Sequence, residues 1–241
     1  MPTILAIETS SELASCALLQ GDKVLSRAAS GVRTHSLSIL PMVQALLQEA
    51  GITLKQCDAI AYGSGPGSFT GVRTACGIAQ GLAFGASLPL VPVMTLDAMA
   101  LACRQQHGST EMVTILDARM GEVYWAQYRQ VDGLPALSTV IPATLSKPGQ
   151  VAPQNTPVTA CGNGLSAYPE AFQDAGMDCH PDIMPHAIQI AQLGRSAFAA
   201  GKAVAAREAQ PLYLRNKIAF TSAERADIQS AKAAAEAEAH S

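Results

Sequence analysis

Residues 63–84 have the sequence GSGPGSFTGVRTACGIAQGLAF, and this stretch decides the fold class. The apolar run before it, Asp58 to Tyr62, predicts a β-strand. The glycines and Pro66 predict a loop from Gly63 to Ser68, and Thr70 to Phe84 has the composition of a helix. A strand, a glycine-rich loop and a helix in this order are typical of α/β proteins, and the helix N-terminus offers an anion site.

The glycine spacing does not fit the known phosphate loops. No Gly-Lys-Ser/Thr follows the glycines, and Gly63, Gly65 and Gly67 alternate singly, so neither a P-loop nor a G-x-G-x-x-G turn is present. The alternative is a tight turn that needs positive φ angles. The pattern by itself gives little support to phosphate binding.

The helix predicted over Thr70–Phe84 has two different faces. Its apolar stripe contains Val72, Ala75, Cys76, Ile78, Ala79, Leu82 and Ala83. The opposite side carries Thr74, Gly77 and Gly81, edged by Arg73, Gln80 and Phe84. Because a mid-helix glycine costs roughly 1 kcal/mol relative to alanine, two of them on one face indicate close approach of another backbone. That backbone belongs either to the helix over Ser36–Ala50 or to another subunit.

The helix predicted over Ser36–Ala50 also has a broad apolar arc. The arc contains Ile39, Leu40, Met42, Val43, Leu46, Leu47 and Ala50. One core contact needs a narrower arc, so either the helix packs on two sides within its own domain or another chain covers one flank. A subunit interface built from both helices would use Leu40, Val43, Leu47, Arg73, Thr74, Gly77, Gln80, Gly81 and Phe84.

The order of elements along the chain predicts two related α/β lobes. Predicted strands cover Thr3–Ile7, Ala14–Leu19, Lys23–Arg27, Leu90–Val93, Val113–Leu116, Val123–Tyr128 and Val158–Cys161, and further helices cover Leu96–Gln105 and Ala187–Ala200. We expect a first lobe over residues 1–106, a second over 107–221, and a loosely held alanine-rich tail over 222–241.

Composition narrows the function classes. The chain has 241 residues, 49% of them hydrophobic and 15% charged, with a net charge of −3. This balance supports a large core but not tight, self-sufficient binding of nucleic acid. No signal peptide and no bilayer-spanning run is visible, so a cytoplasmic protein without membrane contact is expected. The six cysteines form no C-x-x-C pair and are expected to be buried free thiols.

Motifs for catalysis are missing from the sequence. The five histidines form neither H-x-x-x-H nor H-E-x-x-H, and Ser68 lacks the G-x-S-x-G spacing of a nucleophile elbow. Glu8, Asp117 and Glu122 lie near predicted loop tips, where acidic residues can hold a metal but more often cap turns. We therefore expect no metal and no cofactor held by this chain itself.

Four segments together resemble the TsaB family, also called YeaZ. They are ILAIETS at 4–10, GPGSFTGVRTACGIAQGLAF at 65–84, DAR with EVY at 117–119 and 122–124, and PLYLR at 211–215. The resemblance implies two actin-like (ribonuclease H-like) lobes of the sugar kinase/Hsp70/actin superfamily. It also implies a role in making threonylcarbamoyladenosine, the modified adenosine beside the anticodon of certain tRNAs.

The resemblance further implies partners. In that system the related TsaD is the catalytic subunit and holds a metal through H-x-x-x-H, the ATPase TsaE joins the pair, and TsaB alone forms a homodimer through its first-lobe helices. Transfer RNA is met only through the complex, which uses ATP. In this chain Thr95 and Met99 stand where TsaD has its histidines. A hydroxyl and a thioether are poor ligands for such a metal, so a catalytic metal is not expected.

Part of the nucleotide-binding machinery of actin-like ATPases has counterparts in this chain. The resemblance assigns vestigial nucleotide-binding positions to Thr9, Ser10, Asp117, Arg119, Gly162 and Gly164. The second phosphate turn normally has small glycines, whereas Arg119 would either crowd a phosphate or pair with it. We therefore do not expect ATP hydrolysis, while nucleotide binding stays open. The rival functions are a metal-dependent protease, an independent ATPase, and a tRNA-binding adaptor, which the acidic balance disfavours.

Overall fold

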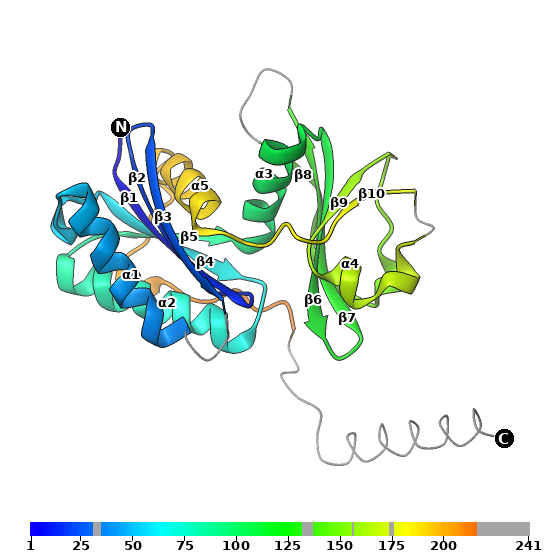
Figure 1. The fold of residues 1–241 in the computed structure, drawn as a ribbon, viewed down its shortest axis with the longest axis horizontal. Coiled ribbons are helices and arrows are strands. Elements are labelled where there is room, and N and C mark those ends of the chain that lie inside the picture. The colour runs from blue at the N-terminus through cyan, green and yellow to red at the C-terminus, as the bar shows by residue number, and fades with distance from the viewer. Residues whose placement is uncertain (31–34, 132–136, 156, 174–175, 216–241) are drawn as a thin grey trace, which may run out of the picture.

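The computed structural model describes residues 1–30, 35–131, 137–155, 157–173 and 176–215. The tail predicted over 222–241 lies outside these residues. Two lobes stand side by side, each built on a five-stranded sheet (Figure 1). The mixed α/β class and the two-lobed architecture predicted from the order of elements are both confirmed.

The first sheet has the order β3-β2-β1-β4-β5. Its strands are β1 (Ile4–Glu8), β2 (Leu13–Gln20), β3 (Lys23–Ser30), β4 (Ala59–Gly65) and β5 (Leu90–Met94). β1, β2 and β3 form an antiparallel meander, whereas β4 and β5 run parallel to β1. Parallel strands need a crossover, and the helices α1 (His35–Ala50) and α2 (Phe69–Ala86) supply the two crossovers.

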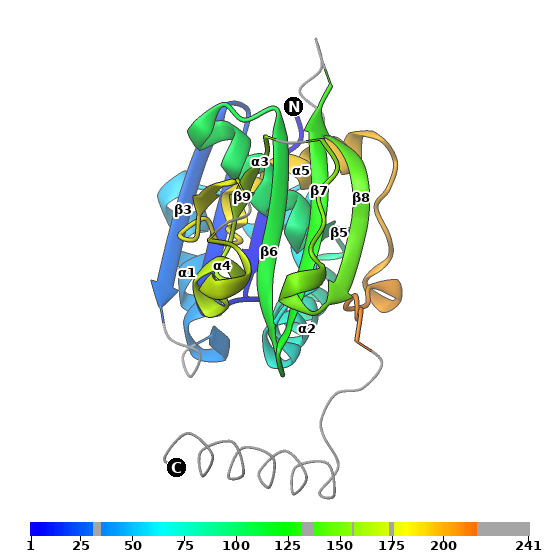
Figure 2. The ribbon, with the colours of Figure 1, turned by 90° about the vertical axis from the view of Figure 1, so that its right-hand side faces the viewer.

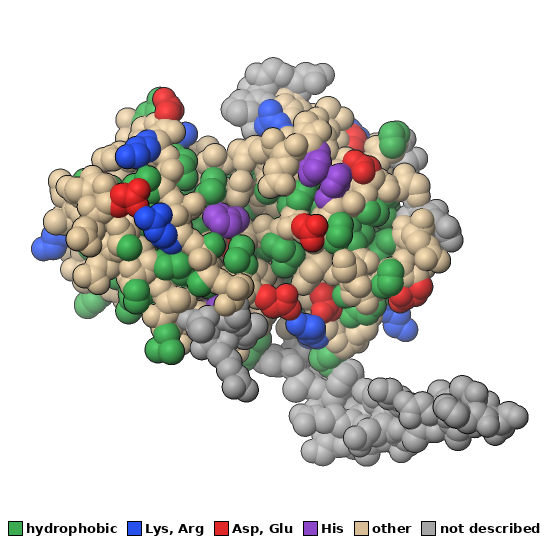
Figure 3. All heavy atoms as spheres, in the orientation of Figure 1, with side chains coloured by type: hydrophobic (Ala, Val, Ile, Leu, Met, Phe, Trp, Pro, Cys, Tyr) green, Lys and Arg blue, Asp and Glu red, His purple; other side chains and the backbone are tan. Residues whose placement is uncertain are grey.

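Both faces of the first sheet are covered, because alternate residues of a strand point to opposite sides. Leu5 and Ile7 of β1 share a core with α1 and α2. Ile4 and Ala6 point the other way and lie in a separate apolar cluster. The outer side of α1 and α2 faces solvent, and hydrophobic side chains stand on the surface there, at the lower left of Figure 3.

The second sheet repeats the first strand by strand. It contains β6 (Glu111–Arg119), β7 (Glu122–Gln130), β8 (Leu137–Ser146), β9 (Thr159–Cys161) and β10 (Asp178–His180), in the order β8-β7-β6-β9-β10. β6, β7 and β8 are antiparallel neighbours, and β9 and β10 continue the sheet in parallel. The hairpin turn after β1 therefore corresponds to the turn after β6, and the two turns face each other between the lobes.

The two long helices between the sheets are exchanged relative to chain order. α3 (Thr95–His107) follows β5 of the first sheet, yet Leu96, Met99 and Cys103 pack on the second sheet. α5 (Ala187–Ala199) follows the second sheet, yet it packs on Ile4 and Ala61 of the first. α3 and α5 lie between the two sheets (Figure 1), and they touch through Gln105, which bonds Gln189 and Gln192.

This exchange corrects the predicted lobe boundaries of 1–106 and 107–221. α3 belongs to the second lobe by its packing, and α5 belongs to the first. The physical reason is that the face of β1 carrying Ile4 and Ala6 has to be removed from water, and α5 is the helix that covers it. A single cut near residue 107 therefore does not divide the chain into its two folding units.

Short elements complete the second lobe. α4 (Gly164–Ala167) and the 3-10 turn η4 (Pro169–Ala171) lie over the face of the second sheet that α3 does not cover (Figure 2). Further 3-10 turns are η2 (Leu54–Gln56), η3 (Pro148–Gln150) and η5 (Ala206–Glu208). All six cysteines are free, and all but Cys179 are buried, as predicted for five of them. None of the described helices combines the length and the apolar character needed to cross a bilayer.

The packing of α5 predicts opposite stability effects for two helix glycines. A Cβ at Gly194 would lie 2.5 Å from the Cβ of Ala61, whereas a Cβ at Gly77 would meet nothing within 4 Å. We expect Gly194→Ala to lower the free energy of unfolding by about 1–3 kcal/mol through overpacking. Gly77→Ala should raise it by up to about 1 kcal/mol through helix propensity. Urea unfolding of both variants checks this, and equal shifts would contradict the packing of α5 on the first sheet.

Candidate functional site: the interlobe cleft and the outer face of α1 and α2

The glycine-rich loop lies directly on the turn between β1 and β2. The amide of Ser68 donates to the carbonyl oxygen of Ser10 at 2.7 Å, and the hydroxyl of Thr9 donates to the carbonyl oxygen of Gly71 at 2.7 Å. A Cβ at Gly71 would lie 2.0 Å from the carbonyl oxygen of Thr9, and one at Gly67 would lie 2.6 Å from Ser10. The glycines are therefore needed for contact with the chain itself.

Glu8 ends β1 and is completely buried beneath this contact. Its Oε1 accepts a hydrogen bond from the amide of Ser10 at 2.5 Å, and Oε2 has no partner among the described residues. A Cβ at Gly63 would lie 1.8 Å from Oε2, so only glycine leaves room for this carboxyl. Burial raises the pKa of Glu8, and hydrogen bonds from Ser10 and Thr9 offset the rise only in part.

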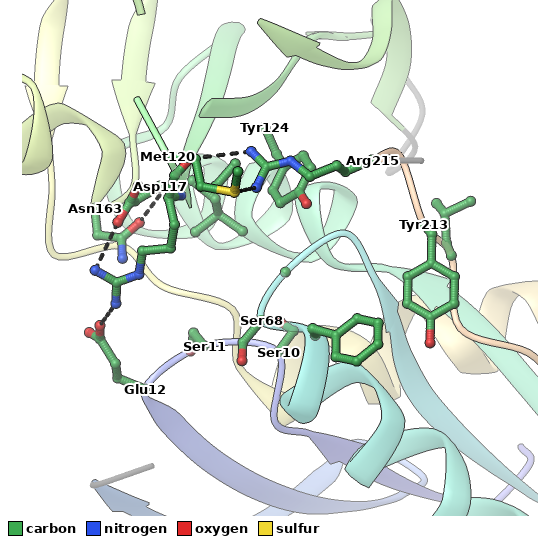
Figure 4. A pocket seen from close by; sticks show the side chains of 16 residues that line it. Ser10, Ser11, Glu12, Ser68, Asp117, Met120, Tyr124, Asn163, Tyr213 and Arg215 are labelled. Carbon is green, nitrogen blue, oxygen red and sulfur yellow. Dashed lines mark hydrogen bonds and ion pairs between the residues drawn. The ribbon is translucent and has the colours of Figure 1, made fainter. Parts of the chain in front are cut away.

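A cleft of about 320 Å³ opens between the lobes (Figure 4). Ser10, Glu12 and Ser68 line it from the first lobe, and Asp117 and Arg119 line it from the second. The C-terminal segment adds Leu212, Tyr213 and Arg215. Both hairpin turns therefore contribute to one site, as the duplicated topology requires.

Arg119 spans the cleft and pairs with acidic groups of both lobes. Its Nη2 lies 3.0 Å from Oε1 of Glu12, and its Nη1 lies 3.1 Å from Oδ2 of Asp117. The Asp117 carboxylate also accepts from the amide of Arg119 at 2.7 Å and from the hydroxyl of Tyr168 at 3.0 Å. Because the Arg119 side chain is 73% exposed, the pair with Glu12 adds little stability, but it occupies the space between the turns.

The structure divides the six predicted nucleotide-binding positions into two sets. Ser10, Asp117 and Arg119 line the cleft. Thr9, Gly162 and Gly164 are not among its lining residues, which departs from the prediction.

Each of these three positions is used by the protein's own packing. Thr9 is buried and bonded to Gly71. A Cβ at Gly162 would lie 2.2 Å from the carbonyl oxygen of Ile115, and one at Gly164 would lie 2.6 Å from its Cγ2, so both glycines let α4 approach β6.

Among the lining residues of the cleft that sequence reasoning missed, Asn163, Tyr213 and Arg215 make the most informative contacts. The amide of Asp117 donates to Oδ1 of Asn163 at 3.0 Å, so Asn163 fixes the second turn. Tyr213 and Arg215 belong to the PLYLR segment, which carried part of the family resemblance without an assigned role. Their position in the cleft depends on contacts with residues far away in the chain, such as Arg73 for Tyr213 and Glu122 for Arg215, which no local pattern reports.

An actin-like fold implies a nucleotide and its metal in this cleft, and the acidic residues present do not fit the metal. Arg119 already neutralises Asp117, and the Glu8 carboxyl is buried out of reach. Within the described part of the chain, no group of three histidine, cysteine, aspartate or glutamate side chains is placed to hold a metal ion. Glu122, also considered as a ligand, pairs with Arg215 instead.

The outer face of α1 and α2 is the second candidate site. Phe84 is 83% exposed, Leu40 is 50% exposed and Leu37, which the sequence did not single out, is 76% exposed. A Cβ at Gly77 or Gly81 would meet no described atom within 4 Å, so α1 does not fill the glycine face. This excludes α1 as the backbone that packs there and leaves the face open.

Some residues predicted for this interface are engaged by the chain itself. Val43 is only 3% exposed and belongs to the core. The Gln80 amide donates to the carbonyl oxygens of Ala206 and Ala209, both at 3.0 Å. Arg73 stacks over the ring of Phe69 at 3.6 Å. Thr74 bonds the carbonyl of Thr70 within its own helix, and Leu40 and Leu47 border a shallow groove that reaches Leu82.

The sequence of the chain is similar to those of known proteins. The profile of the family described as "TsaD: tRNA N6-adenosine threonylcarbamoyltransferase" matches residues 23–227. The chain is 40% identical to the tRNA threonylcarbamoyladenosine biosynthesis protein TsaB of Escherichia coli (strain K12), over 90% of this chain and 96% of the relative. The chain belongs to the TsaB family. The Haemophilus influenzae TsaB is 37% identical, over 90% and 95% of the two chains.

Solved structures support the TsaB fold. YeaZ from Pseudomonas aeruginosa superposes with a TM-score of 0.82 at 37% identity, covering 89% of this chain and 100% of that one. A second Pseudomonas aeruginosa structure, described as an uncharacterized protein with similarity to peptidase YEAZ, gives a TM-score of 0.83 at the same identity and coverage. The TsaB-family resemblance and the two-lobed fold predicted from it are thereby confirmed.

The buried Glu8 of this TsaB-family chain predicts a specific pH dependence. Because its pKa is raised in the folded state, the neutral carboxyl stabilises the fold at low pH, and this contribution is lost as pH rises through the folded pKa. Glu8→Gln keeps an acceptor for the Ser10 amide but cannot ionise. The stability of the variant relative to wild type should therefore increase as pH rises from 4.5 to 8. Urea midpoints across this range test it, and a pH-independent difference would show that Glu8 does not titrate as described.

Proposed function

We propose that this chain is a non-catalytic partner subunit, required with TsaD and TsaE for threonylcarbamoyl transfer to the adenosine beside the anticodon of tRNA. It forms a heterodimer with TsaD through the outer face of α1 and α2, and a homodimer through the same face when TsaD is absent. It acts in the cytoplasm, meets tRNA only through the complex, and holds no cofactor of its own. The names of its relatives support the pathway.

The single observation that carries the partner role is the open glycine face beside exposed apolar side chains. Gly77 and Gly81 lie one turn apart on α2 with free space above them, and Phe84 projects into solvent at the end of the row. The distance between packed helices depends on the side chains at the contact, so two glycines allow a close approach. Exposed apolar patches of this kind mark association surfaces.

The positions that hold the metal in TsaD support a non-catalytic role. Thr95 and Met99 are both completely buried at the start of α3. Met99 packs on the α3 side of the second sheet, where its Cε lies 2.6 Å from the position a Cβ of Gly162 would take. A histidine pair at these places would have no open coordination site, because the α3 core fills the space. Protease chemistry through this route is therefore disfavoured.

Leucine at the glycine face should block assembly without harming the fold. Gly77→Leu and Gly81→Leu both place a bulky side chain into open space and replace a poor helix former with a good one. We expect complex formation with purified TsaD to weaken by at least about a hundredfold, which corresponds to roughly 2.7 kcal/mol. The masses of the mixed subunits, measured by light scattering, check the assembly, and circular dichroism checks the fold.

Two control variants make this test specific. Gln106→Leu adds the same side chain to an exposed position of α3, away from the proposed interface, and should leave assembly unchanged. Gly77→Ala should reduce assembly less than Gly77→Leu, because alanine adds one carbon. Normal complexes formed by both leucine variants would show that the glycine face is not the docking surface.

The ion pairs of Arg119 in the cleft also predict that the isolated subunit does not hydrolyse ATP. Because Arg119 takes the acidic groups that a metal-bound nucleotide would need, ATP turnover by the purified chain should not exceed the background rate. Phosphate release assays with and without Mg²⁺ measure this. Turnover well above background that disappears in Asp117→Asn would favour the independent ATPase and contradict the non-catalytic role.

A further inference from the structure

The segment Ala206–Arg215 crosses from the first lobe to the second, and we call it the strap. At its start it is held by Gln80 of α2, whose amide donates to the carbonyl oxygens of Ala206 and Ala209. Next, the hydroxyl of Tyr62 donates to the carbonyl oxygen of Gln210 at 3.1 Å. The amide of Leu212 then donates to Ser64 of β4 at 2.7 Å. The strap is therefore fixed to the first lobe at successive points.

Tyr213 joins the strap to the first half of α2. Nε of Arg73 donates to the Tyr213 hydroxyl at 2.7 Å, and the rings of Tyr213 and Phe69 lie 5.8 Å apart. The Arg73 guanidinium packs against both rings, at 3.6 Å from Phe69 and 5.6 Å from Tyr213. An arginine in contact with two aromatic faces gains cation–π attraction in addition to its hydrogen bond.

Arg215 joins the strap to the turn between β6 and β7. Its Nη2 donates to the carboxylate of Glu122 and to the carbonyl oxygen of Arg119, the latter at 3.2 Å. Its Nη1 lies 3.0 Å from the sulfur of Met120 (Figure 4). The Arg215 side chain is 13% exposed and that of Glu122 is 35% exposed. Loss of one member of such a partly buried pair leaves an uncompensated charge. The Arg215–Glu122 pair therefore holds the turn more firmly than the exposed ion pairs nearby.

The same α2 residues belong to the strap contacts and to the edge of the glycine face. Arg73 precedes Gly77 by one turn, and Gln80 immediately precedes Gly81. Gly77 lies between these two strap contacts along α2, and Gly81 lies directly beside the second, so a chain packed over the two glycines lies next to both. At the other end, the strap holds the turn whose Arg119 reaches Glu12 across the cleft.

We propose that the strap couples the docking face of α2 to the β6–β7 turn, and thereby to the width of the interlobe cleft. This inference rests on the proposed function only in taking α2 as the docking helix. A partner that moves Arg73 or Gln80 loosens the strap and releases the turn, and by thermodynamic reciprocity a displaced turn changes the affinity of the α2 face. The alternative is a strap that only adds stability.

The coupling can be tested on the isolated chain. Tyr213→Phe removes the hydroxyl that accepts from Arg73 and keeps the ring, and Arg73→Ala removes the whole contact at an exposed position. Each should raise the hydrogen-exchange rates of backbone amides 117–123 by at least about fivefold, the lower range of site-to-site coupling. Glu49→Gln, which breaks the exposed pair with Arg27 away from the strap, should change none of them. Unchanged exchange in both strap variants would overturn the proposal.

A double variant separates coupling from independent damage. Glu122→Gln weakens the far end of the strap, so its effect and that of Arg73→Ala should not multiply when they are combined. The exchange rates of the double variant should stay close to those of the faster single variant. Sites without shared contacts normally act independently. A full product of the two increases would mean that α2 and the turn are uncoupled, and would overturn the proposal.

In the last experiment, purified TsaD is added and hydrogen exchange of the same backbone amides is measured. In wild type, complex formation should change the exchange of residues 117–123 at least fivefold in either direction, and in Tyr213→Phe the change should be lost. The mass of the complex is measured on the same samples. A missing complex contradicts the proposed docking face, while the isolated-chain result still decides the coupling. A complex that forms and leaves the turn unchanged overturns the coupling and leaves the docking face standing.

Discussion

Close backbone packing between residues 63–71 and the turn after β1 is the contact on which the rest of the structure depends. Here a carbonyl of the turn lies where a Cβ of Gly71 would be, and a buried carboxyl fills the space beside Gly63. The contact sets the start of α2, because Ser68 both bonds the turn and caps the helix. The direction of α2 in turn decides where its glycine face points. The same sequence feature thus serves the core on one side and leaves an open face on the other.

The sequence predicted the two lobes, the four long helices and three of the residues that line the cleft, and the reasons are local. Periodicity and turn residues located β1, β2, α1, α2 and α5 within a few residues, and the acidic positions at strand ends led to Asp117. Periodicity reports that a helix has an apolar face, but it does not report which sheet that face covers. The exchange of α3 and α5 could therefore not be predicted. Gly162 and Gly164 show a related limit of sequence patterns, since a glycine needed for packing on Ile115 looks the same as one needed for a ligand.

In the cleft, side chains of the chain itself link the two hairpin turns of the duplicated fold. Arg119 forms ion pairs with Glu12 of the first lobe and Asp117 of the second. Arg215 forms an ion pair with Glu122 of the second lobe. The pair between Arg119 and Glu12 links the two turns directly. The apolar surface that remains lies on the outside, over α1 and α2. The two halves of the site therefore differ in kind: the cleft is polar and crossed by ion pairs, whereas the outer face is apolar and exposed.

The exchange of α3 and α5 has a consequence for how the chain is synthesised. When residues 1–94 have left the ribosome, all five strands of the first sheet exist, but the face of Ile4, Ala6 and Ala61 has no cover. That cover arrives only with α5, about a hundred residues later. During this interval the nascent first lobe exposes a strip of apolar β-sheet, which favours chaperone binding and aggregation over independent folding. The two lobes must therefore mature together, although each resembles a complete domain.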